Sequence, residues 1–209
     1  RTVGGTTHVV LNHTVNVGTG TRAAIRWYDV VNPASTPSVA QYGTYNPTAD
    51  NRWMGSAAMD SAGDLAVGYS VSSGSTYPSI RYAGRAPGDA TGALGAETTL
   101  KAGGGSQTSG TNRWGDYSSL VVDPLDGCTF WYTNEYYETT GLNWQTRIGS
   151  FKFAQCTPID TTPPTAIDET ATTNQGVAVP VTLQGSDPDS CELTFSIVNG
   201  PANGTLGSI

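Results

Sequence analysis

The chain has 209 residues, of which only 13% are charged, and its formal net charge is −7. The sequence therefore holds no basic stripe that would neutralise nucleic-acid phosphates, and none of its apolar runs approaches the length that spans a bilayer. The composition argues against a nucleic-acid partner and against a transmembrane segment in this chain.

Strand-like runs follow one another along the first three quarters of the chain, and helical periodicity is nearly absent. Each run is bounded by Gly, Asn, Asp, Ser or Pro, the residues that form turns. The low charge, the many Gly, Ser and Thr residues and the ten Tyr residues are typical of a bacterial extracellular β protein. We therefore expect an all-β fold with strands at residues 8–11, 23–30, 56–59, 65–71, 79–83, 119–122, 129–137 and 147–153.

One sequence block occurs twice. Residues 51–53 and 112–114 both read Asn-Arg-Trp, and each copy continues into an Asp/Gly-rich turn, at 60–64 and at 123–127. The two copies are offset by 61 residues at the tryptophans and by 63 at the aspartates that open the turns, so the second copy has gained two residues. A repeated unit of this size indicates a repeat architecture.

The two turns also carry a recognisable motif. The strings Asp60-Ser-Ala-Gly-Asp-Leu and Asp123-Pro-Leu-Asp-Gly-Cys-Thr-Phe-Trp resemble the Asp-box (Ser/Thr-x-Asp-x-Gly-x-Thr-Trp/Phe) of sialidase-like and BNR-repeat β-propellers. The resemblance covers roughly residues 1–156 and implies four-stranded antiparallel blades arranged around an axis. About two and a half blades are expected here, as a partial β-propeller within a fragment of a longer protein.

The composition changes after Cys156. Residues 157–165 are rich in Pro and Thr and predict an extended linker. Residues 166–209 contain strand-like runs at 175–183 and 193–198. These runs and the string Gly-Pro-Ala-Asn-Gly-Thr-Leu at 200–206 resemble bacterial Ig-like or cadherin-like modules. Because such a sandwich needs about 100 residues, we expect only the N-terminal part of one, in a secreted or cell-surface protein.

The three cysteines predict one disulfide. If Trp131 faces Phe153 in an antiparallel hairpin, Cys128 and Cys156 lie opposite each other at its open end, at a separation that suits a disulfide. The alternative is that both are unrelated buried thiols. Cys191 is left over, either free or with a partner elsewhere.

The propeller resemblance implies candidate catalytic residues. Sialidase-like enzymes place three Arg around a substrate carboxylate, with a Tyr/Glu nucleophile pair and an Asp acid/base. The residues of these types in and around the two copies are Arg52, Arg113, Arg147, Asp116, Tyr117, Glu135, Tyr136 and Tyr137.

Repeat symmetry divides these candidates. Arg52 and Arg113 hold equivalent positions, and a structural residue obeys the symmetry that a catalytic residue breaks. We therefore expect Arg-Trp to pack blades, with the guanidinium stacked on an aromatic ring or bonded to backbone carbonyls. The residues retained as catalytic candidates are Arg113, Asp116, Tyr117, Glu135 and Tyr136.

A non-enzymatic function needs only an exposed aromatic surface for a sugar or a protein. The residues expected to form it are Trp114, Tyr117, Tyr136, Tyr137 and Trp144. We expect this binding or adhesion function with a glycan or protein ligand; the alternatives are a sialidase-like glycoside hydrolase and a purely structural stalk.

No cofactor is expected, apart from calcium at one place. The aspartates of the two Asp/Gly turns are explained by side chains that cap their own turns. Asp187 and Asp189 are candidate calcium ligands, because cadherin-like modules use such turns between domains.

Overall fold

The computed structural model describes residues 1–108, 113–158, 162–187 and 193–207. These residues form strands and turns, and among them no helix is long and apolar enough to cross a membrane. The all-β prediction is confirmed. The chain divides into two compact units, residues 1–158 and 159–209.

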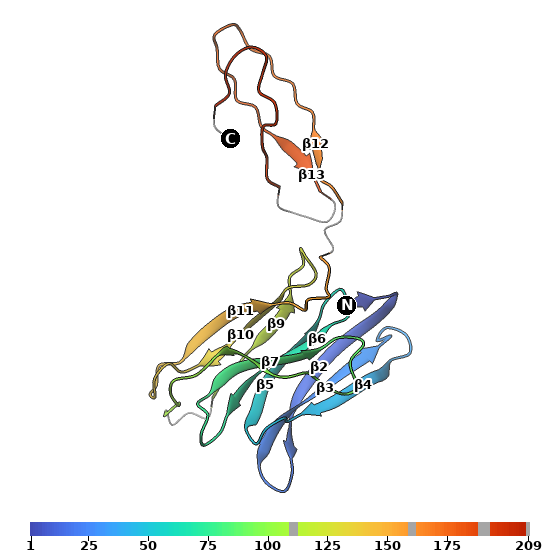
Figure 1. Cartoon of the computed structure of the whole chain (residues 1–209), viewed down its shortest axis with the longest axis vertical. Coiled ribbons are helices and arrows are strands. Elements are labelled where there is room, and N and C mark those ends of the chain that lie inside the picture. Colours follow the sequence, from blue (N-terminus) through green and yellow to red (C-terminus); the bar gives the residue numbers. More distant parts are fainter. Residues whose placement is uncertain (109–112, 159–161, 188–192, 208–209) are drawn as a thin grey trace. The chain divides into compact units, whose positions relative to one another are not determined.

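The first unit consists of three antiparallel sheets that follow one another along the chain. The first sheet has the order β1-β2-β3-β4 and the second the order β5-β6-β7-β8, while the third has β10 between β9 and β11. In Figure 1 the three sheets lie side by side as successive layers. Their strands are β1 (Thr2–Val3), β2 (Thr6–Val17), β3 (Arg22–Val31), β4 (Ser38–Tyr45), β5 (Asn51–Met59), β6 (Leu65–Ser72), β7 (Ser79–Arg85), β8 (Thr98–Lys101), β9 (Ser119–Val122), β10 (Phe130–Tyr136) and β11 (Gln145–Phe151).

The second sheet is covered on both faces, and β6 is buried along almost its whole length. Successive side chains of a strand point to opposite faces, so alternate residues of β6 enter two separate cores. Leu65, Val67, Tyr69 and Val71 pack with β3 of the first sheet, and Ala66 packs with β10 of the third.

Gly68 allows the third sheet to approach closely. A Cβ on Gly68 would lie 2.4 Å from the Tyr132 ring, inside the van der Waals contact distance. The ring of Tyr132 therefore occupies the space that a side chain at position 68 would need, and the two sheets pack tightly at this point.

The backbone preserves the repeat. Met54 and Gly115, which each follow the repeat tryptophan, both adopt a left-handed conformation with φ of 51°. In the first copy this residue lies in an irregularity of β5 between Trp53 and Ser56. In the second copy regular pairing starts only at Ser119, so the two additional residues of the second copy fall within 115–118.

The aspartates of both Asp/Gly turns accept hydrogen bonds from their own turns, as predicted. Asp60 accepts from the N–H groups of Ala62 and Asp64, each at 2.9 Å. Asp126 accepts from the N–H and the hydroxyl group of Thr129, at 2.8 and 2.6 Å. The turns also contact each other, because the N–H of Ser61 donates to the carbonyl of Gly127 at 2.8 Å.

Cys128 and Cys156 form the predicted disulfide, but the register from which it was inferred is wrong. Trp131 pairs with Ser150 rather than with Phe153, and β11 ends at Phe151. The ring of Phe151 stacks on that of Phe130 with centroids 5.2 Å apart, which favours the observed pairing. A turn after β11, closed by the N–H of Cys156 donating to the carbonyl of Phe153, brings the two cysteines together.

Three strands of the first unit were not predicted. These are β1, which has only two residues, β4, an edge strand whose side chains are mostly exposed, and β8, which has only four residues. None of them carries the alternation of apolar and polar residues that a half-buried strand shows.

The strand predictions for the second unit are wrong. Residues 175–183 and 193–198 have no strand structure, and the described strands are β12 (Thr165–Ile167) and β13 (Gln184–Ser186), which pair antiparallel. Val177 and Val179 are exposed. Alternation produces a strand only where a neighbouring backbone and an apolar layer are available, and in the described part of this unit the alternating residues meet neither.

We predict that replacing both disulfide cysteines by serine lowers the free energy of unfolding by about 3 kcal/mol, because the bond closes a loop with a sequence separation of 28 residues. Urea unfolding of the double variant against the parent protein measures the loss. Reducing agent should destabilise the parent protein and leave the double variant unchanged; equal midpoints for the two oxidised proteins would contradict the prediction.

We also predict that Asp60 makes the protein more stable as the pH falls from about 6 to about 4. Burial raises the pKa of Asp60 to about 6, and the neighbouring Asp64 carboxylate adds to the rise. The folded state therefore binds this proton more tightly than the unfolded chain, by roughly 1–3 kcal/mol. Asp60→Asn should abolish this gain, because the amide stays neutral and keeps the turn's hydrogen bonds; urea unfolding across the pH range measures the effect.

Asp126→Asn is the matched control from the second turn. Burial raises the pKa of Asp126, but hydrogen bonds from Thr129 and Cys128 outweigh burial and hold the pKa below its ordinary value. Its contribution therefore has the opposite sign: it is present above about pH 4 and is lost as the pH falls through the lowered pKa. The same change of pH slope in both variants would refute the assignment of the two carboxyl groups.

Candidate functional site

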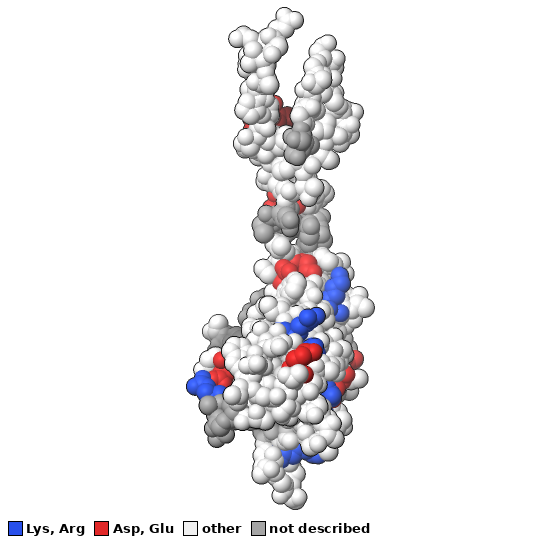
Figure 2. Space-filling view, turned by 90° about the vertical axis from the view of Figure 1, so that its left-hand side faces the viewer, with Lys and Arg blue, Asp and Glu red and all other residues white. Residues whose placement is uncertain are grey.

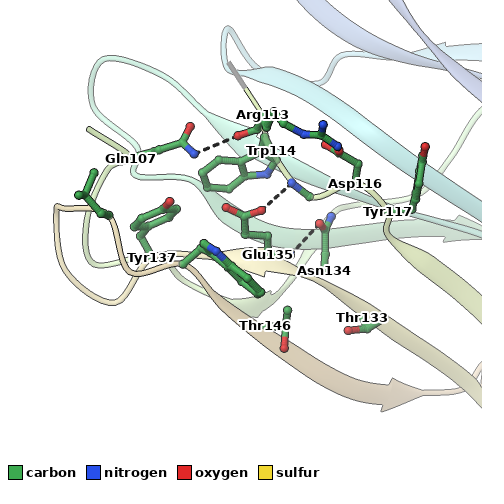
Figure 3. A pocket seen from close by; sticks show the side chains of 13 residues that line it. Gln107, Arg113, Trp114, Asp116, Tyr117, Thr133, Asn134, Glu135, Tyr137 and Thr146 are labelled. Atoms are coloured by element: carbon green, nitrogen blue, oxygen red, sulfur yellow. Dashed lines mark hydrogen bonds and ion pairs between the residues drawn. The ribbon is translucent and has the colours of Figure 1, made fainter. Parts of the chain in front are cut away.

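A cavity of about 470 Å³ lies at one end of the third sheet, and we call it the Trp114 pocket (Figure 3). Its walls come from the segment before β9, from β10 and the loop after it, and from one residue of β11. The residues that line it are Gln107, Arg113, Trp114, Gly115, Asp116, Tyr117, Thr133, Asn134, Glu135, Tyr137, Leu142, Trp144 and Thr146.

The pocket brings together most of the residues singled out from the sequence. Seven of them line it, namely Arg113, Trp114, Asp116, Tyr117, Glu135, Tyr137 and Trp144. Tyr136 lies outside, because it points into the core between the second and third sheets and donates a hydrogen bond to Gln145. Arg147 is exposed on β11 outside the pocket, and Arg52 is buried elsewhere.

Trp114 is held firmly by its neighbours. Its indole N–H donates to the Ser70 hydroxyl of β6 at 2.9 Å. Its ring meets the Trp53 ring edge to face, with centroids 5.9 Å apart, and stacks on the Tyr137 ring at 5.5 Å. The tryptophans of the two repeat copies therefore contact each other, and the second presents a fixed aromatic surface to the pocket.

The two repeat arginines have different environments. Arg52 is fully buried, pairs with Glu97 at 2.8 Å, donates to the carbonyl of Asp50 at 3.0 Å and lies over the Tyr45 ring at 5.9 Å. Both of its expected contacts, with an aromatic ring and with a backbone carbonyl, are confirmed. The side chain of Arg113 is 78% exposed and pairs with Asp116, so the packing function expected for it is wrong.

The different environments follow from the two added residues. They extend the chain between Trp114 and the start of β9 and place Asp116 beside the Arg113 guanidinium. In the first copy, by contrast, the chain enters β5 directly and the arginine is directed into the core, where Glu97 receives it.

Glu135 is the half-buried carboxylate of the pocket. It accepts a hydrogen bond from the N–H of Gly115 at 2.6 Å, drawn as a dashed line in Figure 3. Burial raises the pKa of Glu135, and the nearby negative charge of Asp116 raises it further. No ion pair to Glu135 is present among the residues that the structure describes, so its charge is not balanced by a protein cation there.

The arrangement meets one requirement of a sialidase-like site and lacks another. Arg113, Glu135 and the tyrosines Tyr117 and Tyr137 line the same pocket, as that hypothesis requires. However, Arg113 is the one arginine among the described lining residues, so three guanidinium groups do not converge on one point.

Sequence reasoning missed several polar lining residues, among them Gln107. It lies on the chain segment after β8, which runs past the loop after β10: the N–H of Gly104 donates to the carbonyl of Tyr137 at 2.8 Å. A Cβ on Gly104 would lie 2.2 Å from the carbonyl oxygen of Glu138. The Gly-Gly-Gly run at 103–105 was therefore a usable signal of a close backbone approach.

Only one of the two calcium candidates lies among the described residues. Asp187 lies just after β13, and Asp189 lies outside the described residues, as does Cys191. Over the described ranges, no group of three or more His, Cys, Asp or Glu side chains is placed to hold a metal ion. Calcium at Asp187 and Asp189 stays a prediction.

The surface charge is sparse. On the face drawn in Figure 2, Lys and Arg side chains are few and lie among Asp and Glu side chains. This distribution provides no continuous cationic track on that face for a nucleic-acid backbone.

None of the known protein families, curated proteins or solved structures compared with the chain matches it. The fold and the site therefore define the class of protein at the level of architecture: an all-β chain of stacked antiparallel sheets with an aromatic, acidic pocket.

The two repeat arginines generate a matched prediction. Arg52→Ala should lower the free energy of unfolding by about 3 kcal/mol, because it leaves Glu97 buried with one of its two arginine partners missing. Arg113→Ala should change it by less than about 0.5 kcal/mol, since that side chain is exposed. Urea unfolding of both variants measures the difference, and comparable losses would show that the two copies remain equivalent.

Proposed function

We propose that this chain is part of a secreted or cell-surface bacterial binding protein and that the Trp114 pocket binds a glycan. The main support for this proposal is the composition of the pocket wall. Aromatic rings lie beside carboxylate, amide and hydroxyl groups in one cavity. A sugar presents apolar C–H faces and a rim of hydroxyl groups, and such a wall complements both.

The exposure of the rim residues supports the proposal. Trp144 is 62% exposed, Tyr117 94% and Leu142 65%. Large apolar side chains are rarely left in water together unless a ligand covers them. Deeper in the pocket, Tyr137 is fully buried and stacked on Trp114, so the aromatic surface continues from the rim inward.

The architecture supports the propeller interpretation and the location. Three successive antiparallel sheets stacked face to face are what consecutive propeller blades would form. The disulfide favours an oxidising compartment. In this proposal the second unit belongs to an Ig-like spacer, which would carry the binding unit away from a cell surface.

One observation favours the alternative, a sialidase-like glycoside hydrolase. Asp116 and Glu135 line the same pocket, and burial raises the pKa of Glu135. A pair of carboxyl groups in one site is the usual apparatus of glycoside hydrolysis. We favour binding, because the described wall offers Arg113 alone for a sialic acid carboxylate, and that guanidinium is already paired with Asp116.

Binding is tested on a glycan array, followed by titration calorimetry with the best ligand. Trp144→Ala should weaken binding about tenfold, the loss of one stacking surface. Trp131→Ala is the control, because Trp131 is also partly exposed on the third sheet but lies outside the pocket. Equal losses in the two variants would exclude the pocket as the binding site.

Hydrolysis is tested with the same protein. Incubation with sialyllactose and with neutral oligosaccharides should release no monosaccharide. If the protein hydrolyses one of these substrates and Glu135→Gln abolishes the hydrolysis, the pocket is the active site of a glycoside hydrolase and the binding proposal is wrong.

A further inference from the structure

We infer that the Trp114 pocket recognises a sugar that carries a free, cationic amino group, with Glu135 as the group that binds the ammonium. The inference rests on the proposed glycan-binding function and adds the chemical class of the ligand.

The charge of the pocket favours a cationic ligand. The described lining residues include one cation, Arg113, and two carboxylates, Asp116 and Glu135. The ion pair between Arg113 and Asp116 uses the cation. Glu135 keeps an uncompensated negative charge in a partly buried position, where a ligand cation is attracted more strongly than in open water.

The carboxylate of Glu135 is held by one hydrogen bond and can accept more. One of its carboxylate oxygens accepts from the Gly115 N–H at 2.6 Å, which fixes the direction of the group. A carboxylate has further lone pairs beyond this bond. A ligand ammonium is the donor that suits them best, because charge-assisted hydrogen bonds are shorter and stronger than neutral ones.

The aromatic wall of the pocket also favours a cation. Trp114 and Tyr137 are stacked with ring centroids 5.5 Å apart, and Trp144 lines the same cavity. The faces of such rings carry negative potential and attract ammonium groups. Figure 3 shows Trp114, Tyr137 and Glu135 around the same space, so the rings and the carboxylate favour the same kind of ligand.

The pocket wall also contains a polar group without a partner. Tyr137 lines the pocket, and its buried hydroxyl has no hydrogen-bond partner among the described residues. A buried polar atom without a partner is unfavourable. A ligand rich in hydroxyl and amino groups therefore matches this wall better than an apolar cation.

The charges of the pocket also disfavour anionic sugars. The carboxylate of a sialic acid would meet Glu135 and Asp116, with a guanidinium that Asp116 already neutralises. An N-acetylated amino sugar keeps the shape of the amine but loses its charge. Acetylated and free forms of one oligosaccharide are therefore a matched pair of ligands that isolates the proposed interaction.

The test is titration calorimetry of the whole chain with a tetrasaccharide of β-1,4-linked glucosamine and with its fully N-acetylated form. The free amine should bind at least about tenfold more tightly, as one charge-assisted hydrogen bond predicts. Raising the salt concentration should weaken binding of the amine more than that of the acetylated form.

Glu135→Gln should remove the preference for the amine while keeping an oxygen that accepts from Gly115. Glu138→Gln is the matched control, because Glu138 lies three residues further on, pairs with Lys101 and is not part of the pocket wall. Circular dichroism and urea unfolding confirm that both variants are folded.

The outcomes separate the two proposals. Equal affinity for the two forms, or a preference that survives Glu135→Gln, overturns the inference and leaves glycan binding standing. If the protein binds a neutral or sialylated glycan in a way that depends on Trp144 and does not bind the amine, the inference is likewise wrong and glycan binding still stands. A protein that binds neither tetrasaccharide, nor any glycan of the array, overturns both.

Discussion

The structure of the first unit depends on burying β6 from both sides. Residues 65, 67, 69 and 71 enter one core and Ala66 enters the other, so neighbouring sheets are joined through a single strand. Ser70 on β6 extends this connection to the pocket, because its hydroxyl accepts hydrogen bonds from both Trp114 and Asn134. The central strand thus positions the floor of the pocket as well as the two cores that stabilise the unit.

Local patterns predicted much of the first unit because they report local physics. The run at 119–122 is a strand with the predicted limits. The aspartates of the two turns accept hydrogen bonds from backbone N–H groups of the same turns. The disulfide was predicted although the hairpin register behind it was wrong. Register depends on turn length and on ring packing between Phe130 and Phe151, and neither can be read from alternation alone.

The rest of the fold depends on distant partners. β4 and β8 form because an already ordered strand offers its free edge, which no local pattern reports. In the second unit the opposite holds: the alternation at 175–183 is clear, but the described structure provides no sheet for it. For the site, the aromatic and acidic residues were predicted, while Gln107 was missed because its position results from chain segments that meet only in the folded protein.

The left-handed residue that follows each repeat tryptophan has a consequence for how the two copies have diverged. At this position the first copy holds a methionine, for which such a backbone conformation is unfavourable by about 1–2 kcal/mol, whereas glycine in the second copy adopts it freely. The two copies thus share a backbone shape at this position although their side chains differ. The copy with glycine has the longer adjoining segment and the pocket, whereas the copy with methionine has its arginine buried in the protein interior.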